Sequence, residues 1–224
     1  MKKIKIKRFR DQKNNPIYLL DFFFIFHAFF SYLKFKIFKK LKMTLINYNS
    51  FKIYKVLSKK KLRILEIVSG FSTLWWQNQN INRLVSIETD KSWHKKISAD
   101  ISSDKVQIIF SKKKIFKIPR IKYDLCIIDG FDRFYDLNLC LKEIYKHTII
   151  YLDDSDGDSS YLYNNKDTDM RKAENLLREF SLKHNRYILT CRGFSPTQLY
   201  VKEGMFSIPK FYFNKIKELK KFAI

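Results

Sequence analysis

Residues 62–76 read LRILEIVSGFSTLWW and contain the transition that decides the fold. The first seven form a short apolar run rich in β-branched residues, which is typical of a strand buried on both faces. Gly70 follows, where a strand-to-helix turn would let the backbone approach a ligand, and Ser72 or Thr73 could cap the helix behind it. The stretch therefore predicts a strand, a turn suited to ligand binding and a helix.

Similar runs recur along the chain, with helix-like segments between them. Such alternation predicts an α/β fold with a parallel sheet and right-handed crossovers. Ligands of these sheets bind at the carboxyl ends of the strands, near the point where the strand order reverses. We expect strands at 62–68, 83–88, 105–110, 123–129 and 147–153, helices at 72–80, 91–101, 132–146 and 166–184, and an antiparallel pair at 186–192 and 197–203.

Residues 1–61 differ in composition and are predicted to be a basic, aromatic-rich helical extension before a domain at 62–224. They hold 17 of the 45 Lys and Arg residues but 2 of the 22 Asp and Glu residues. Segment 17–33, IYLLDFFFIFHAFFSYL, would be roughly 25 Å long as a helix, short of the ~30 Å core of a bilayer. Two interpretations stay open: packing on a protein surface, or peripheral membrane contact through residues 17–42.

The formal charge of +23 would suit an acidic partner. However, 35 of the basic residues are Lys and only ten are Arg, which argues against nucleic acid because phosphate readers favour the guanidinium fork. No small-residue cleavage site follows the apolar run, so we expect a cytoplasmic protein or one at the inner face of a membrane. The three separated cysteines, Cys126, Cys140 and Cys191, are expected to be reduced core thiols.

Glu88 ends the second predicted strand, where a carboxylate can accept hydrogen bonds from both hydroxyls of a ribose. The preceding turn does not match the dinucleotide fingerprint, which would need glycine at positions 68, 70 and 73. Only Gly70 is present. The pattern therefore favours a nucleoside-containing ligand other than NAD or FAD.

Four stretches in order, LEIVSGFSTLWW, LVSIETDKSW, YDLCIIDGFDR and IIYLDDSD, resemble the class I S-adenosylmethionine-dependent methyltransferases. They resemble in particular a branch that reads E-x-G-S-G-x-S-T-L-W-W, V-E-x-D, I-D-G and D-D-S-D. This resemblance implies a Rossmann-like seven-stranded sheet with an antiparallel last strand, and S-adenosylmethionine as the cofactor. The cofactor-binding residues that it implies are Glu66, Ser69, Gly70, Ser72, Glu88 and Asp129.

Val68 stands where that branch usually has glycine. A β-branched side chain there would crowd the carboxylate end of the cofactor or shift the loop. The departure leaves open a weakened or lost activity.

Acidic residues follow the fourth and fifth predicted strands, and three interpretations of them stay open. Asp129, Asp153 and Asp154 are similar to the metal site of catechol-type and macrolide-sugar O-methyltransferases, which implies Mg²⁺. Alternatively, Asp129 or Asp154 is a catalytic general base. The third interpretation treats residues 154–158 as a solvated turn.

The leading hypothesis is an S-adenosylmethionine-dependent methyltransferase that methylates a hydroxyl of a sugar, glycan or small metabolite. One alternative is a non-catalytic binding or scaffold protein that keeps the fold. Another is an RNA methyltransferase that uses the basic extension. A fold-retaining scaffold would bind no cofactor, or bind it without turnover, whereas RNA binding would weaken steeply with salt.

Overall fold

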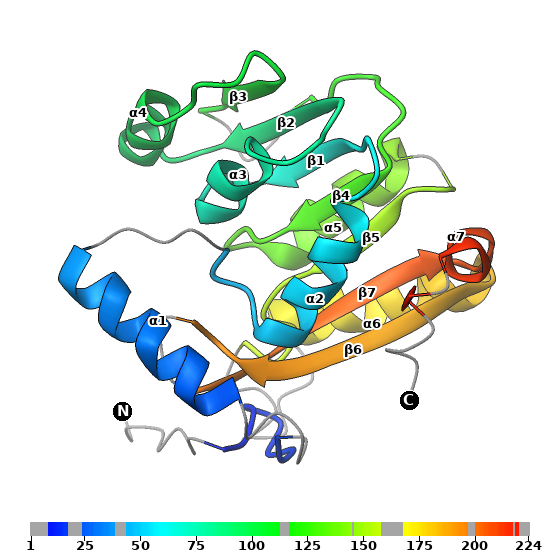
Figure 1. Ribbon diagram of the computed structural model, residues 1–224. Coiled ribbons are helices and arrows are strands. Elements are labelled where there is room, and N and C mark those ends of the chain that lie inside the picture. Colours follow the sequence, from blue (N-terminus) through cyan, green and yellow to red (C-terminus); the bar gives the residue numbers. More distant parts are fainter. Residues whose placement is uncertain are drawn as a thin grey trace.

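A single seven-stranded sheet organises the computed structural model, with helices on both faces (Figure 1). The model describes residues 9–17, 24–38, 44–112, 117–144, 146–157, 168–196, 200–216 and 218–219. The strand order is β3-β2-β1-β4-β5-β7-β6, and β7 runs antiparallel to both of its neighbours. This confirms the predicted Rossmann-like sheet with an antiparallel last strand. The strands are β1 (Arg63–Ile67), β2 (Arg83–Glu88), β3 (Val106–Phe110), β4 (Leu125–Ile128), β5 (Ile149–Leu152), β6 (Arg186–Phe194) and β7 (Val201–Pro209).

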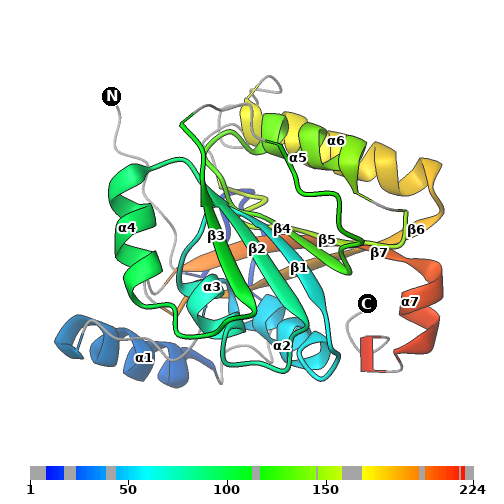
Figure 2. The ribbon, with the colours of Figure 1, turned by 90° about the horizontal axis from the view of Figure 1, so that it is seen from above.

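Helices cover the sheet in two layers, as the view from above shows (Figure 2). α5 and α6 lie on one face, and α2 and α3 lie on the other. Each layer has its own apolar cluster because successive strand residues point to opposite faces. The helices are α1 (Phe24–Phe38), α2 (Tyr48–Leu57), α3 (Phe71–Trp76), α4 (Lys91–Ala99), α5 (Arg133–Glu143), α6 (Asp169–Lys183) and α7 (Lys210–Lys215).

Most predicted boundaries differ from the observed ones by a few residues, and two of the differences have local reasons. β1 ends at Ile67 because Val68 has a φ of 73° and turns the chain away from the sheet. β7 extends to Pro209, beyond the predicted end at residue 203, because Ser207 and its neighbours pair with β5 as well as with β6. Parts of the predicted segments lie outside the described residues: 18–23 and 39–42 of the apolar and basic segment, 145 and 166–167 of the helices, 158 of the turn and 197–199 of the last strand.

α2 comes from the predicted extension and packs into the same apolar cluster as the sheet. Its Tyr54 is fully buried against Trp76 of α3, Tyr151 of β5 and Phe206 of β7. The division of the chain at residue 61 stays a prediction. No helix in the described ranges is long and apolar enough to cross a membrane. The three cysteines are buried free thiols, as expected of core residues.

Gly204 in β7 has no room for a side chain, because the ring of Tyr151 lies against its Cα. A Cβ at this position would be 2.5 Å from the Tyr151 hydroxyl and 2.7 Å from the Ser50 hydroxyl. We expect Gly204→Ala to lower the free energy of unfolding by about 1–3 kcal/mol, because a fully buried ring must move. Urea denaturation measures this change.

Gly193→Ala is the matched control, since Gly193 lies in the adjacent strand and its added Cβ would meet nothing closer than 3.4 Å. Equal losses in both variants would contradict the steric explanation.

Candidate functional site

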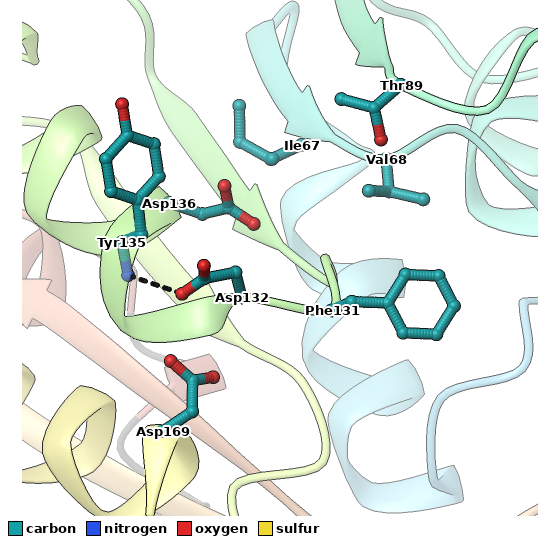
Figure 3. A pocket seen from close by; sticks show the side chains of 8 residues that line it. All are labelled: Ile67, Val68, Thr89, Phe131, Asp132, Tyr135, Asp136 and Asp169. Carbon is teal, nitrogen blue, oxygen red and sulfur yellow. Dashed lines mark hydrogen bonds between the residues drawn. The ribbon is translucent and has the colours of Figure 1, made fainter. Parts of the chain in front are cut away.

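The sheet reverses its strand order between β1 and β4, and a pocket opens beside that point. Its volume is about 400 Å³. Figure 3 shows Val68 and Thr89, which follow β1 and β2, on one side of it and acidic side chains of α5 and α6 on the other. The lining residues are Ile67, Val68, Thr89, Phe131, Asp132, Tyr135, Asp136 and Asp169.

Val68 lines this pocket in a backbone conformation that favours glycine. Its φ of 73° lies in the left-handed region, which a β-branched residue rarely adopts. The backbone is held there by a 2.8 Å hydrogen bond from the Val68 amide to the carbonyl of Ile87. The chain therefore keeps the turn that the methyltransferase pattern encodes with glycine, but places a branched side chain on the pocket wall.

Glu88 is almost completely buried at the end of β2 and holds the turn after β1. Oε2 accepts hydrogen bonds from the amide and the hydroxyl of Ser69 at 3.1 and 2.8 Å. Oε1 accepts from the amides of Thr89 and Asp90 at 2.7 and 2.8 Å. The indole of Trp93 also donates to the carbonyl of Ser69 at 2.6 Å. A ribose hydroxyl that binds Glu88 would have to replace the Ser69 hydroxyl as the hydrogen-bond donor to the Glu88 carboxylate.

Glu66 lies on β1 and joins the strand to α3. Its carboxylate accepts hydrogen bonds from the hydroxyls of Ser72 and Thr73. Burial raises the pKa of Glu66 to about 7, against the opposing effect of these hydroxyls. Glu66 and Ser72 thus contact each other in this structure, and their contact with a cofactor stays a prediction.

Gly70 caps the start of α3 and faces open space. A Cβ added there would meet nothing within 4 Å. Its amide donates to the Thr73 hydroxyl at 2.8 Å. The backbone at Gly70 is therefore accessible to a ligand that enters from the carboxyl edge of the sheet.

Asp129 follows β4 and Asp154 follows β5, and two cations contact their carboxylates. Arg133 contacts Asp129 at 3.1 Å and Asp154 at 3.7 Å, and Lys202 contacts Asp154 at 2.8 Å. Burial raises the pKa of Asp129 to about 6, Arg133 opposes this shift, and Asp154 adds to it. A carboxylate with such a pKa can accept a proton near neutral pH.

Asp153, which precedes Asp154, hydrogen-bonds to a core tyrosine. It is buried, and Oδ1 accepts a 2.6 Å hydrogen bond from the hydroxyl of Tyr151. No group of three or more His, Cys, Asp or Glu side chains suited to a metal ion occurs among the residues that the structure describes. The predicted Mg²⁺ site of Asp129, Asp153 and Asp154 is therefore not supported. The hydroxyl of Tyr151 and the cations Arg133 and Lys202 contact these carboxylates instead.

The segment after β5 is a turn that is only partly solvated, since Gly157 is exposed and Asp154 is half-buried. Asp153, Ser155 and Asp156 are buried. The Asp156 carboxylate accepts hydrogen bonds from the amides of Gln12 and Glu203 at 3.0 and 2.8 Å. The prediction of a solvated turn at 154–158 is therefore wrong for Ser155 and Asp156.

Asp153 also predicts a pH dependence of stability. Burial and the neighbouring carboxylates Asp154 and Asp129 raise the pKa of Asp153 to about 8. The folded protein then binds this proton more tightly than the unfolded chain, so the contribution of Asp153 to the free energy of unfolding falls as the pH rises from about 4 to about 8. We expect Asp153→Asn, which keeps an acceptor for Tyr151, to gain stability over the wild type across this range.

Urea denaturation at about pH 5 and about pH 8 measures the difference. Asp90→Asn is the control, because the pKa of exposed Asp90 is lowered by the Ser92 hydroxyl and the Trp93 amide. Its difference from the wild type should not change over the same range. A constant difference for Asp153→Asn as well would contradict the raised pKa.

The sequence prediction missed the acidic wall of the pocket. Asp132 and Asp136 follow β4 within the stretch DGFDRFYD, which could have indicated them. Asp169 belongs to α6 and accepts hydrogen bonds from the amides of Arg133 and Phe134 at 2.8 and 3.0 Å. Only the packing of α6 beside α5 brings it to the site.

No protein-family model and no curated protein matches the sequence. Solved structures do match the fold. An O-methyltransferase from Bacillus cereus in complex with S-adenosylhomocysteine has a TM-score of 0.57 and 12% identity, over 85% of this chain and 96% of that chain. The O-methyltransferase TomG from Streptomyces achromogenes, in complex with S-adenosylmethionine, has a TM-score of 0.57 and 11% identity, over 92% of this chain and 99% of that chain.

This chain has the fold of S-adenosylmethionine-dependent methyltransferases. The likeness covers most of the chain. At such identities it concerns the fold, and the chemistry has to be argued from the pocket.

Proposed function

We propose that the chain is an S-adenosylmethionine-dependent methyltransferase that methylates a hydroxyl of a small-molecule or glycan acceptor. The observation that carries the proposal is the pocket at the strand-order reversal, which has an acidic wall beside exposed aromatic surface. Asp132, Asp136 and Asp169 supply carboxyl groups, and Phe131 is 98% exposed at the rim. A ligand that combines a sulfonium cation with an adenine ring matches both features.

The residues present fit such a cofactor in part. Gly70 leaves its backbone open to the methionine portion, and Glu88 is at the place where a ribose would be held. The bound cofactor would supply a methyl group on a cationic sulfur. Asp129, kept in place by Arg133, would take the proton from the acceptor hydroxyl as the oxygen attacks the methyl carbon.

A second candidate function is a non-catalytic protein that keeps the methyltransferase fold. Two observations support it: the Val68 side chain lines the pocket where the pattern has glycine, and the Ser69 hydroxyl donates a hydrogen bond to Glu88. Under this hypothesis the pocket takes no adenosyl ligand, or takes it without methyl transfer.

Titration of the purified protein with S-adenosylhomocysteine, followed by calorimetry, distinguishes these proposals, with NAD as the control ligand. We expect saturable binding of the adenosyl ligand and none of NAD. Val68→Gly should bind at least as tightly as the wild type, because it removes the isopropyl side chain from the pocket wall. Absence of binding to both folded proteins would overturn the methyltransferase proposal.

Methyl transfer is then assayed with S-adenosylmethionine and a panel of hydroxyl-bearing acceptors, with S-adenosylhomocysteine release as the readout. Release that depends on an acceptor supports the enzyme. Binding with no release across the panel would favour the fold-retaining protein instead.

A further inference from the structure

α1 lies at the periphery of the molecule (Figures 1 and 2). Ala28 is fully buried in a small cluster with Tyr48, Phe194 and Val201. The Tyr48 hydroxyl lies 2.8 Å from Nδ1 of His27 and donates to the Ser31 hydroxyl at 3.1 Å. These contacts fix which side of the helix faces outward.

The outward side carries large apolar side chains in solvent. Phe26 is 71% exposed, Phe29 44%, Phe30 60% and Ile37 69%. Their spacing of three, four and eleven residues places them on one face of an α-helix. Monomeric proteins rarely expose such a row of large side chains without a partner for it.

The sequence around this face is strongly basic, although Lys59 and Arg63 pair with Glu218 and Asp124. Residues 22–65 contain no Asp or Glu, but they contain ten Lys and one Arg. Lys34 and Lys36 occupy helix positions on either flank of the apolar face, and Lys39, Lys40 and Lys42 follow in the sequence. An apolar face between basic flanks is typical of helices that lie in the interface of an anionic bilayer.

We propose that α1 docks on the surface of an anionic lipid bilayer, with Phe26, Phe30 and Ile37 at the boundary between headgroups and acyl chains. The helix has 15 residues, which gives a length of about 22 Å. Its exposed apolar side chains extend from Phe26 to Ile37, which suits a helix lying in the plane of the membrane. A second copy of this chain fits the face less well, because docking would bring two segments of equal positive charge together.

The orientation of α1 gives this docking a consequence for the candidate site. Phe194 is the last residue of β6 and Val201 is the first residue of β7. Because β6 runs in the same direction as β1 and β4, α1 is attached at the edge of the sheet where the pocket opens. Docking would therefore bring that edge of the sheet toward the bilayer. The docking proposal does not depend on the proposed function.

Sedimentation of the full chain with phosphatidylcholine vesicles, with and without phosphatidylserine, tests the proposal. We expect binding to the vesicles with phosphatidylserine, and weaker binding when salt screens the lysines. The double variant Phe26→Ser/Phe30→Ser should lower the partition coefficient at least about tenfold, because two exposed rings no longer enter the interface. Leu182→Ser is the matched control, since Leu182 is an 83% exposed apolar residue on α6.

Both altered side chains of the double variant are exposed, so its melting temperature should stay near that of the wild type. Equal vesicle binding by the double variant and the wild type would overturn the proposal, as would no binding of the wild type. A dimer in solution that this variant dissociates would assign the face to a second copy and would also overturn it.

Discussion

Asp129→Asn is expected to lower the rate of methyl transfer by about 10²- to 10⁴-fold, the usual contribution of a general base. Asparagine keeps the shape of the side chain and an oxygen for Arg133, which lies 3.1 Å from Oδ1, but it accepts no proton. Binding of S-adenosylhomocysteine should change by only a few fold. The measurement is S-adenosylhomocysteine release with the best acceptor of the panel.

The wild-type rate should also depend on pH in a defined direction. A base must be deprotonated to act, so the rate should rise with pH through the pKa of Asp129, near 6, and level off above it. Asp100→Asn is the control, because exposed Asp100 lies at the end of α4. An Asp129→Asn protein that turns over at the wild-type rate would rule out this residue as the base.

Glu88→Ala is expected to abolish the thermal shift that S-adenosylhomocysteine produces. For the wild type, a ligand at 100 times its dissociation constant adds about 2.7 kcal/mol to the free energy of unfolding. Alanine removes the acceptor for a ribose and leaves the amides of Ser69, Thr89 and Asp90 without their carboxylate. We therefore also expect a loss of about 1–3 kcal/mol of stability in the ligand-free protein.

Glu88→Gln separates these two effects, because it keeps the size of the side chain and one carbonyl acceptor. It should retain more stability than Glu88→Ala, but bind the adenosyl ligand more weakly than the wild type. A folded Glu88→Ala protein that keeps the full ligand-induced shift would show that Glu88 holds the turn and does not hold the ligand.

Most of the sheet could be predicted from the sequence because its strands are local, continuous apolar runs. The runs around Ile64, Val85, Ile127 and Ile150 each fall within an observed strand. The strand ends were less predictable. A one-residue turn such as that at Val68 depends on backbone geometry that a valine does not indicate.

The sequence predicted the acidic residues of the candidate site but not the basic residues that pair with them. Asp129 and Asp154 do lie close together, as expected of acids after neighbouring strands. Their partners Arg133 and Lys202 lie on α5 and β7, and nothing in the local sequence pairs a lysine of the last strand with an acid of the fifth. The predicted metal site is unsupported for this reason: the pattern showed the carboxylates but not the cations that neutralise them.

Periodicity and turn chemistry act over a few residues. The sequence alone therefore predicts the α/β class, the order of the helices and strands, and the turn after β1. Which side chains can still contact a ligand depends on the tertiary structure. It closed Ser69 onto Glu88, buried Asp153 against Tyr151 and brought Asp169 of α6 to the pocket. Ser69 and Asp169 meet partners far along the chain, and the burial of Asp153 depends on how the layers pack around the sheet.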